Sequence, residues 1–528
     1  MILKEFTVIF DDMKKLVLSF FTILSIILIS CVNYDLSNKT ECSPLDFDLY
    51  NKESCEYLLM IYADGDNSLY ANIFEDVNEA EYGIRYVESN YGYYSKKIKV
   101  VVLWDGLRGT QYSGTYLFEL GSDNEVNMEI SSSTKNLSSE AKNWISTTGE
   151  LTNNSGEVAM SSYYTLAYFL NWCEQKYDAQ KKILILEDHG TGPGNFYSRS
   201  IVTDNRAICQ DLSVGSYDTL YTKDVSKALE IAGYGNNSRL DLLIEDVCYG
   251  TGIEDIYELN SFTQYYIGSA NQTPGEGHNY TEIIKALVDN DDIKSAGKQI
   301  VSNFADYYRG SNALKENNMA YEFSENPQND VATPTIALFC AEELPTLAQK
   351  ITTVADLLIS EGDEKTYLSN ISYNEYLRNN YVKNNASTGN VLYYTGTMNY
   401  LFDIGWMMDR FSYISSEDGA SALTGLAWKE LNEASNAVND VLSNVIVCSW
   451  RDGYSSQDSS TYGMYSIIDG IKTEDFTNHI FGMTICGGSR LSRTGLKNTV
   501  YSWYKTDLAF GRDTSWYELL VKWFSTIE

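Results

Sequence analysis

The chain has 528 residues, of which 44% are hydrophobic, so it can bury a large core and is not a disordered protein. Acidic residues outnumber basic ones by 72 to 39, and the formal net charge is −33. This charge argues against a nucleic-acid-binding protein, because phosphates are bound by lysine and arginine. It is compatible with attraction of basic substrates and equally with solubility alone.

The N-terminus carries the pattern of a secretion signal. From Met13 the chain reads Met-Lys-Lys, followed by an apolar run from Leu16 to Ile29 and then by Ser30 and Cys31. A positive segment, a short apolar core and a small residue together define a signal peptide. The apolar run is shorter than the ~20 residues that a membrane-spanning helix needs, so a cleaved signal is favoured over a transmembrane anchor.

The end of this signal, Leu-Ile-Ser-Cys at 28–31, resembles a bacterial lipobox. In that interpretation residues 1–31 are a lipoprotein signal peptide, cleavage precedes Cys31, and the Cys31 thiol carries the lipid. The polar stretch 32–55 is then a tether. The protein is therefore expected at the bacterial cell envelope or surface, held at the membrane through the lipid on Cys31.

Apolar segments alternate with helical patterns through residues 56–292. This order predicts an α/β domain with a doubly wound, mostly parallel sheet. Strands are expected at 56–64, 99–105, 183–186 and 240–244, helices at 67–89, 160–177 and 222–233, and a β-hairpin at 115–120 with 125–130. Helical patterns and strand-like runs also alternate in residues 293–528, which are expected to form an α+β C-terminal subdomain packed on the first domain.

Two of the expected strands, 183–186 and 240–244, end alike. The strand at 183–186 is followed by two acids and then by His189. The strand at 240–244 is followed by two acids, one further residue and then Cys248. The helix at 222–233 connects them into a βαβ unit. Parallel strands joined in this way bring their carboxyl ends to one edge of the sheet, so His189 and Cys248 are expected side by side.

A neighbouring thiol and imidazole suit nucleophilic catalysis. A thiolate attacks a carbonyl carbon, and an imidazole tunes its ionisation and protonates the leaving group. Alone, either Cys248 or His189 would more often be structural, and it is their pairing that indicates chemistry. Gly190 leaves its backbone N–H uncovered, so the N–H groups of Gly190 and Cys248 are suited to bind an oxyanion.

These motifs resemble those of the clostripain-like cysteine peptidases (family C11), relatives of caspases, gingipains and legumains. Similar segments occur in the same order at 59–69, 188–190, 246–248, 254–259, 267–269 and 274–277, and more faintly at 508–516. The resemblance implies a caspase-like catalytic domain at 56–292 and a cysteine endopeptidase. Two departures beside the nucleophile, Glu245 and the Val-Cys-Tyr-Gly sequence at 247–250, concern fine specificity.

The resemblance also places Glu276 at the acidic position at the base of the first specificity pocket. Asp246 lies two residues before Cys248, and because side chains alternate along a strand it is expected to point to the same side. Two carboxylates there predict protein or peptide substrates with Arg or Lys before the cut bond. The alternative is that Asp246 caps local backbone and Glu276 is solvated.

A long polar loop, 191–221, separates the two reactive strands. The resembled family is activated by cleavage between the His and the Cys, and exposed loops of this kind are accessible to proteases. Self-cleavage is therefore expected after Arg199 or Arg206, which are the basic residues of this loop.

The expected chemistry requires no cofactor. Asp64 and Asp105 end strands at the reactive edge and make it acidic, but no Cys-x-x-Cys or Cys/His cluster is present, so no metal site is expected. The resemblance implies that calcium can act as a cofactor, although no Asp-x-Asp-x-Asp-Gly loop marks a site.

Two other functions stay open. One is a surface-binding lipoprotein that keeps the fold without catalysis. The other is a transpeptidase or amidase, which would form the same acyl-enzyme and pass it to a different acceptor.

Overall fold

A computed structural model describes residues 51–123, 129–131, 135–136, 158–190, 192, 207–211, 218–271, 273–308, 334–362, 401–418, 427–451, 468–469, 482–486 and 504–525. The chain divides into two units, Met1–Asp46 and Phe47–Glu528, and every described residue belongs to the second. The expected signal peptide and most of the expected tether therefore lie outside the described residues. The first strand begins at Glu53, so the tether would end before residue 55.

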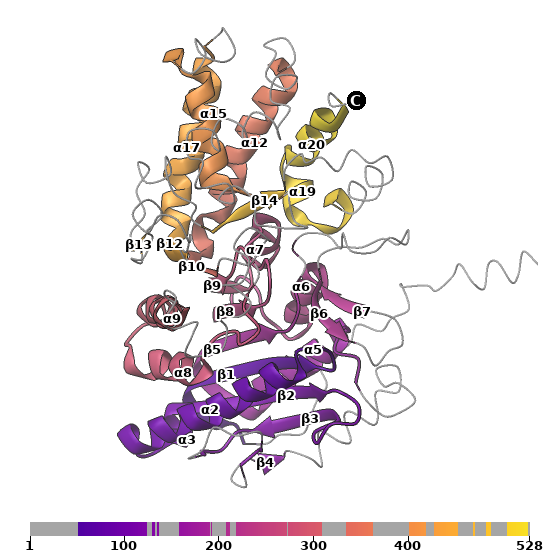
Figure 1. Cartoon of the computed structure of the whole chain (residues 1–528), viewed down its shortest axis with the longest axis vertical. Helices are drawn as coiled ribbons and strands as arrows, with labels where there is room; N and C mark the ends of the chain where they lie inside the picture. Colours follow the sequence, from indigo (N-terminus) through magenta and orange to yellow (C-terminus); the bar gives the residue numbers. More distant parts are fainter. Residues whose placement is uncertain are drawn as a thin grey trace, which may run out of the picture. The chain divides into compact units, whose positions relative to one another are not determined.

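The described part of the second unit is built on a ten-stranded sheet in the order β13-β12-β10-β9-β8-β5-β1-β2-β3-β4 (Figure 1). Its central strands are parallel: β1 (Glu53–Gly65), β2 (Ile98–Gly106), β5 (Tyr177–Glu187), β8 (Leu240–Asp246) and β9 (Thr263–Gly268). The flanking strands are antiparallel: β3 (Gly114–Glu119), β4 (Lys135–Asn136), β10 (Thr335–Cys340), β12 (Ile446–Arg451) and β13 (Ile468–Asp469). Two separate pairs are β6 (Ala207–Asp211) with β7 (Asp218–Tyr221), and β11 (Leu401–Asp403) with β14 (Thr484–Cys486).

The helices complete the framework. Their bounds are α2 (Tyr70–Tyr91), α3 (Tyr94–Lys97), α5 (Tyr163–Lys176), α6 (Thr222–Ile231), α7 (Ile253–Leu259), α8 (Tyr280–Asp289), α9 (Ile293–Tyr308), α12 (Leu344–Glu361), α15 (Ile404–Ser415), α17 (Lys429–Val445), α19 (Ala509–Asp513) and α20 (Trp516–Ser525). Helix α8 begins at Tyr280 because the side chain of Asn279 accepts the Glu282 N–H at 2.9 Å, which satisfies one donor of its first turn.

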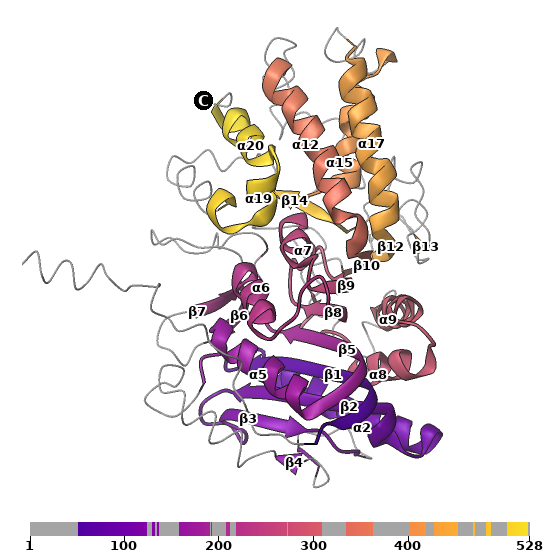
Figure 2. The same cartoon turned by 180° about the vertical axis from the view of Figure 1, so that it is seen from behind.

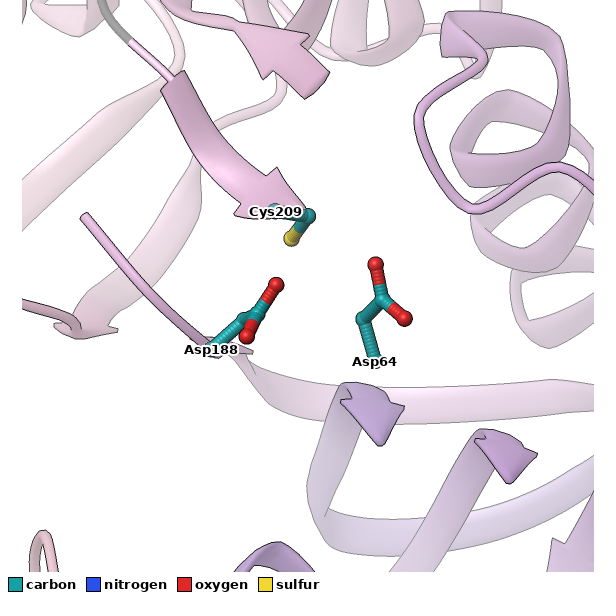
Figure 3. A group of neighbouring side chains, drawn as sticks. All are labelled: Asp64, Asp188 and Cys209. Carbon is teal, nitrogen blue, oxygen red and sulfur yellow. The ribbon is translucent and has the colours of Figure 1, made fainter. Parts of the chain in front are cut away.

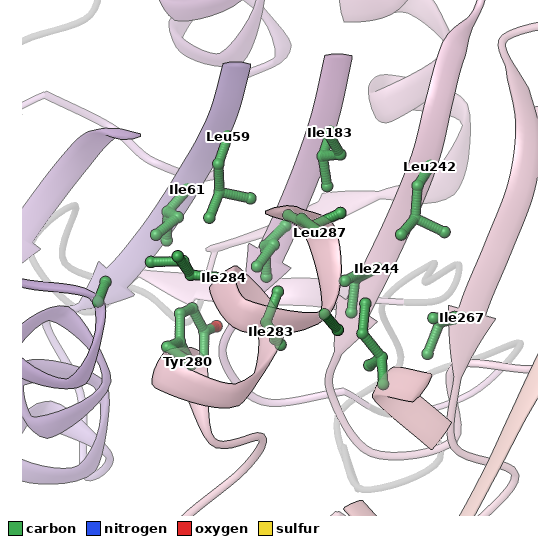
Figure 4. Close-up of a cluster of buried hydrophobic side chains, with 14 of the residues drawn as sticks. Leu59, Ile61, Ile183, Leu242, Ile244, Ile267, Tyr280, Ile283, Ile284 and Leu287 are labelled. Carbon is green, nitrogen blue, oxygen red and sulfur yellow. The ribbon is translucent and has the colours of Figure 1, made fainter. Parts of the chain in front are cut away.

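Helices cover both faces of the parallel strands, because alternate side chains of a strand point to opposite faces. On one face, Ile61, Ile183 and Ile244 belong to an apolar core that also contains Ile284 of α8 (Figure 4). On the other face, the ring of Tyr62 lies 6.2 Å from that of Phe169 in α5. Figure 1 shows α2 in front of the strands, and Figure 2, which gives the view from behind, shows α5 in front of them. The predicted doubly wound α/β sheet is confirmed.

The C-terminal half departs from the prediction at its boundary. β10 pairs with β9, and β12 and β13 extend the same sheet, so the sheet continues across the division expected at 292/293. Residues 293–528 thus add strands to the central sheet besides packing helices near it. The partner of β3 is Lys135–Asn136, whereas the sequence predicted 125–130, most of which lies outside the described residues.

The C-terminal segment is tied to α7, the helix that follows Cys248. Glu254 accepts hydrogen bonds from the Cys486 N–H at 2.8 Å and from the Tyr504 hydroxyl at 2.7 Å. Both contacts are buried, so they anchor residues far along the chain beside the end of β8. None of the helices that the structure describes combines the length and the apolar character needed to cross a bilayer.

Candidate active site

The two reactive segments leave adjacent parallel strands, as the βαβ pattern predicted. Glu187 at the end of β5 pairs with Asp246 at the end of β8, and the Asp188 N–H donates to the Asp246 carbonyl at 3.4 Å. After β2 the strand order reverses, and β5 joins the other side of β1. The carboxyl ends of β1 and β5 therefore flank the switch point, which is where open α/β sheets bind ligands.

Gly190 lies directly against the backbone of Cys248. A Cβ atom at Gly190 would lie 2.2 Å from the Cys248 carbonyl oxygen and 2.9 Å from the Cys248 nitrogen. Real Cβ atoms do not approach backbone so closely, so only glycine fits here. The two segments predicted to meet do meet at this point.

Cys248 is half-buried at the start of a tight turn. The next residue, Tyr249, has a positive φ of 60°, an unfavourable conformation for a bulky residue, and its N–H donates to the Asn271 carbonyl at 2.8 Å. The Cys248 Sγ donates to the Thr273 carbonyl at 3.8 Å. Burial raises the pKa of the Cys248 thiol to about 11, and backbone hydrogen bonds of Thr273 and Gly190 offset part of this rise.

The segment that follows β1 forms hydrogen bonds with His189 and its neighbour Asp188. Nε2 of His189 forms a hydrogen bond of 2.9 Å with the Ser68 hydroxyl, and the Asn67 amide donates to the Asp188 carboxylate at 2.6 Å. Burial lowers the pKa of His189. In this structure the two reactive side chains thus have different partners, Ser68 for His189 and Thr273 for Cys248. Sequence reasoning missed both partners, although Ser68 lies within the 59–69 segment that carried the family resemblance.

The two expected specificity residues lie on adjoining elements. The buried Asp246 carboxylate accepts the His278 N–H at 2.9 Å, and Gly277 comes so close that a Cβ there would be 2.7 Å from Asp246 Oδ2. Glu276 is half-buried on the same turn, and its charge contributes to the raised pKa of Tyr307, about 12, for which burial is the main cause. Asp246 therefore caps the turn that carries Glu276, as the alternative interpretation expected for Asp246. Both carboxylates still adjoin this one turn.

The acidic edge is more extensive than the sequence predicted. Asp64, Asp188 and Cys209 form one buried group (Figure 3), and Asp66, Asp105 and Asp211 form another. In each group the potential ligand atoms lie within 4.8 Å of one another. Burial and the charges of Asp188 and Asp211 raise the pKa of Asp64 well above its ordinary value. The sequence predicted an acidic edge from Asp64 and Asp105, and the other acids join them from segments far apart in the sequence. The expectation that the chain has no metal site stays a prediction.

Three further sites named from the sequence cannot be placed. Cys31, Arg199 and Arg206 lie outside the described residues. Within the expected loop 191–221, β6 and β7 form a two-stranded sheet, which the sequence did not predict.

The close approach of Gly190 gives a direct test of the site. Gly190→Ala is expected to lower kcat/KM by about 100-fold or more, because the new Cβ must push the Gly190 and Cys248 N–H groups out of alignment. The measurement is steady-state hydrolysis together with circular dichroism. Gly275→Ala is the matched control, since its Cβ would meet only Asn72 at 3.7 Å, and it should retain most activity. Equal rates for Gly190→Ala and wild type would remove Gly190 from the site.

Comparisons with known proteins agree with this geometry. The profile of the Clostripain family (peptidase family C11) matches residues 61–523. Clostripain from Hathewaya histolytica is 27% identical over 265 residues, which is 46% of this chain and 45% of that protein. The match thus spans less than half the length of this relative.

Two solved structures share the fold at low sequence identity. One is an inactive zymogen C11 protease from Parabacteroides distasonis, with 18% identity, a TM-score of 0.51 and coverage of 87% of this chain and 98% of that one. The other is a secreted C11 cysteine protease from Bacteroides thetaiotaomicron in complex with an irreversible peptide inhibitor, with 17% identity, a TM-score of 0.50 and coverage of 90% and 99%. Because the family profile spans most of its length and the predicted Cys248 and His189 segments meet at one sheet edge, the chain belongs to the clostripain family of cysteine peptidases.

Proposed function

We propose that the protein is a cysteine endopeptidase in which Cys248 is the nucleophile and His189 the proton carrier. The observation that carries this proposal is the close approach of the Gly190 segment to the Cys248 backbone at the carboxyl ends of β5 and β8. That contact places an imidazole-bearing turn and a thiol-bearing turn at one sheet edge. Family membership supports the same chemistry, and the inhibitor complex of the Bacteroides relative is an example of a peptide bound to this fold.

The reaction proceeds through an acyl-enzyme. The Cys248 sulfur attacks the peptide carbonyl carbon, and the carbonyl oxygen becomes an oxyanion that accepts hydrogen bonds from the Gly190 and Cys248 N–H groups. His189 takes the thiol proton and delivers it to the departing amine, which leaves a thioester on Cys248. Water, deprotonated by His189, then attacks the thioester and releases the acid product.

The resting pair is neutral near pH 7, since burial raises the pKa of Cys248 and lowers that of His189. The thiol proton therefore moves to His189 as the sulfur attacks, instead of residing there beforehand. The Ser68 hydroxyl is bonded to Nε2 of His189, so the other ring nitrogen, Nδ1, is the one that would take the thiol proton. Catalytic hydrogen bonds are often loose in free enzymes and tighten when substrate binds.

We also propose specificity for Arg or Lys before the cut bond. Asp246 and Glu276 adjoin one turn beside the nucleophile, and two carboxylates there would repel each other less with a cationic side chain between them. The Asp246 carboxylate is buried, and its Oδ2 accepts the His278 N–H at 2.9 Å.

The cellular setting rests on the N-terminal sequence alone. We propose that the protein is secreted and lipid-anchored through Cys31 at the bacterial cell envelope, with activation by self-cleavage after Arg199 or Arg206. Cys31→Ser should release the protein from the membrane fraction, whereas a Cys31→Ser protein that remains membrane-bound would argue for another anchor.

A panel of short fluorogenic peptides tests the proposed activity. Hydrolysis after Arg or Lys is expected, and iodoacetamide should abolish it by alkylating Cys248. Product analysis with an added amine distinguishes hydrolysis from amide transfer, since a transpeptidase would attach the amine to the acyl fragment. Absence of any thiol-dependent cleavage across the panel would favour a binding protein that keeps the fold.

A further inference from the structure

Two buried acids beside Asp246 have no role in the proposed mechanism. Glu187 ends β5 opposite Asp246 in β8, and it is 3% exposed. Paired side chains of parallel strands point to the same face of a sheet, which here is the face that α8 covers with Tyr280 (Figure 4). Asp76, also 3% exposed, reaches this group from α2. Its carboxyl group forms a hydrogen bond with that of Glu187.

The hydrogen bond between Asp76 and Glu187 requires a proton, because an ionised carboxylate can only accept hydrogen bonds. No N–H or hydroxyl group of the described residues donates a well-formed hydrogen bond to Glu187 Oε2, although this oxygen is buried. A buried carboxylate without a donor is costly, and such a group ordinarily becomes neutral instead. Without substrate, the pair of Asp76 and Glu187 therefore retains at least one proton.

The charges around the pair favour this proton. Burial raises the pKa of Glu187 to about 8. Burial, followed by the charge of Glu187, raises the pKa of Asp76 well above its ordinary value. Asp246 and Glu79 of α2 add their negative charges to both effects. The pair thus keeps its proton near neutral pH and starts to lose it as the pH rises through about 8.

Three further titratable groups face the pair or Asp246, and they are neutral at physiological pH. Burial raises the pKa of Tyr280 on α8 and that of Tyr308 on α9 well above the ordinary value of tyrosine. Burial also lowers the pKa of His278, whose ring packs against Phe304. A cationic substrate side chain would therefore bring positive charge to a group of acids and neutral side chains.

We infer that Asp76 and Glu187 are further specificity-determining residues: a substrate cation beside Asp246 displaces one proton from the pair to the solvent, and Glu187 then attracts the cation as a second carboxylate. This inference rests on the proposed preference for Arg or Lys. A positive charge nearby lowers the pKa of a carboxyl group by about one to three units, which drives the displacement. Because the free protein holds more protons than the complex, the preference for Arg or Lys should increase with pH until the free protein has lost the proton as well.

The pH profile of the specificity tests this inference. The measured quantity is the ratio of kcat/KM for an Arg peptide to that for the same peptide with citrulline, which resembles Arg in shape but lacks its charge. Titration of Cys248 and His189 affects both peptides and cancels in the ratio. We expect the wild-type ratio to rise by about 10-fold or more between about pH 6.5 and about pH 8.5 and then to level off.

Variants of the two partners should act in opposite directions. Glu187→Gln should flatten the profile and lower the ratio at high pH by about 10-fold, because the second charge can no longer form. Asp76→Asn should move the rise to lower pH, since an amide donates to Glu187 without a proton that has to leave. The control is Glu81→Gln on α2, which removes another buried carboxyl group with a pKa of about 8, one that binds the Ser131 N–H, and it should follow wild type.

Proton release is measured without catalysis on the full chain carrying Cys248→Ala, with benzamidine as the cation. Calorimetry in two buffers of different ionisation enthalpy should show release of a fraction of a proton on binding, and Glu187→Gln should abolish it. The inference fails if benzamidine binds without proton release, or if Arg is preferred over citrulline by a ratio that neither pH nor Glu187→Gln changes. The proposed specificity would then rest on Asp246 and Glu276 alone. Equal rates for the Arg and citrulline peptides at every pH would contradict the proposed specificity and this inference together.

Discussion

Replacing Cys248 with alanine is expected to abolish peptide hydrolysis while the protein stays folded. The sulfur is the atom that forms the thioester, and residues that act as one catalytic unit lose roughly 10⁴–10⁶-fold in kcat when one is removed. The thiol is half-buried and its hydrogen bond to the Thr273 carbonyl is long, at 3.8 Å, so its loss should change the unfolding midpoint little. The measurement is hydrolysis of an Arg or Lys peptide, with circular dichroism to confirm the fold.

His189→Ala and the double variant extend this test. His189→Ala should approach the loss seen for Cys248→Ala, and the double variant should lose little more, because neither residue works without the other. Cys340→Ala is the control, since Cys340 is another half-buried cysteine, at the end of β10, and its removal should leave the rate unchanged. Retention of full activity by Cys248→Ala would overturn the proposed mechanism.

The second large effect concerns specificity. Asp246→Asn and Glu276→Gln should each cut kcat/KM for Arg and Lys peptides by about 30-fold to several thousand-fold, which corresponds to about 2–5 kcal/mol for one partner of a desolvated charge pair. Asparagine can still accept the His278 N–H that Asp246 binds at 2.9 Å, so the turn should survive while the charge is lost. Peptides with a neutral residue before the cut bond should be affected far less.

A nearby surface acid controls for general charge effects. Glu282 lies on α8 and pairs with Lys285 at 2.7 Å, so Glu282→Gln removes one negative charge without touching the Asp246 turn. Its kcat/KM values should match those of wild type for every peptide. Wild-type cleavage after Asp, Asn or apolar residues at the rate seen after Arg or Lys would show that the two carboxylates do not select the substrate.

The parallel core of the fold was readable from the sequence because its signals are local. Ile183 to Leu186 and Leu240 to Ile244 are continuous apolar runs, as expected of strands buried on both faces, and a helical pattern lies between them. The handedness of βαβ units then placed His189 beside Cys248 without further information. The strands β10, β12 and β13 were assigned to a separate subdomain because pairing between distant segments leaves no periodic signal in either of them.

The same distinction explains what was missed at the site. Ser68 and Thr273 contact His189 and Cys248 from loops, where polar residues are common and their partners depend on tertiary structure. Asp105 was recognised as an acid at a strand end, but Asp66 and Asp211 join it only after the chain has folded. Motifs of contiguous ligands are visible in a sequence, whereas a cluster drawn from three segments is not.

Covalent labelling tests the central claim, that Cys248 attacks the substrate carbonyl, most directly. The folded protein is incubated with an irreversible electrophilic peptide that ends in Arg or Lys, and the adduct is located by tandem mass spectrometry. We expect one adduct per chain, on Cys248, with slower labelling of His189→Ala and none of Cys248→Ala. Labelling of a different cysteine, or peptide hydrolysis that continues while Cys248 stays fully alkylated, would contradict the account.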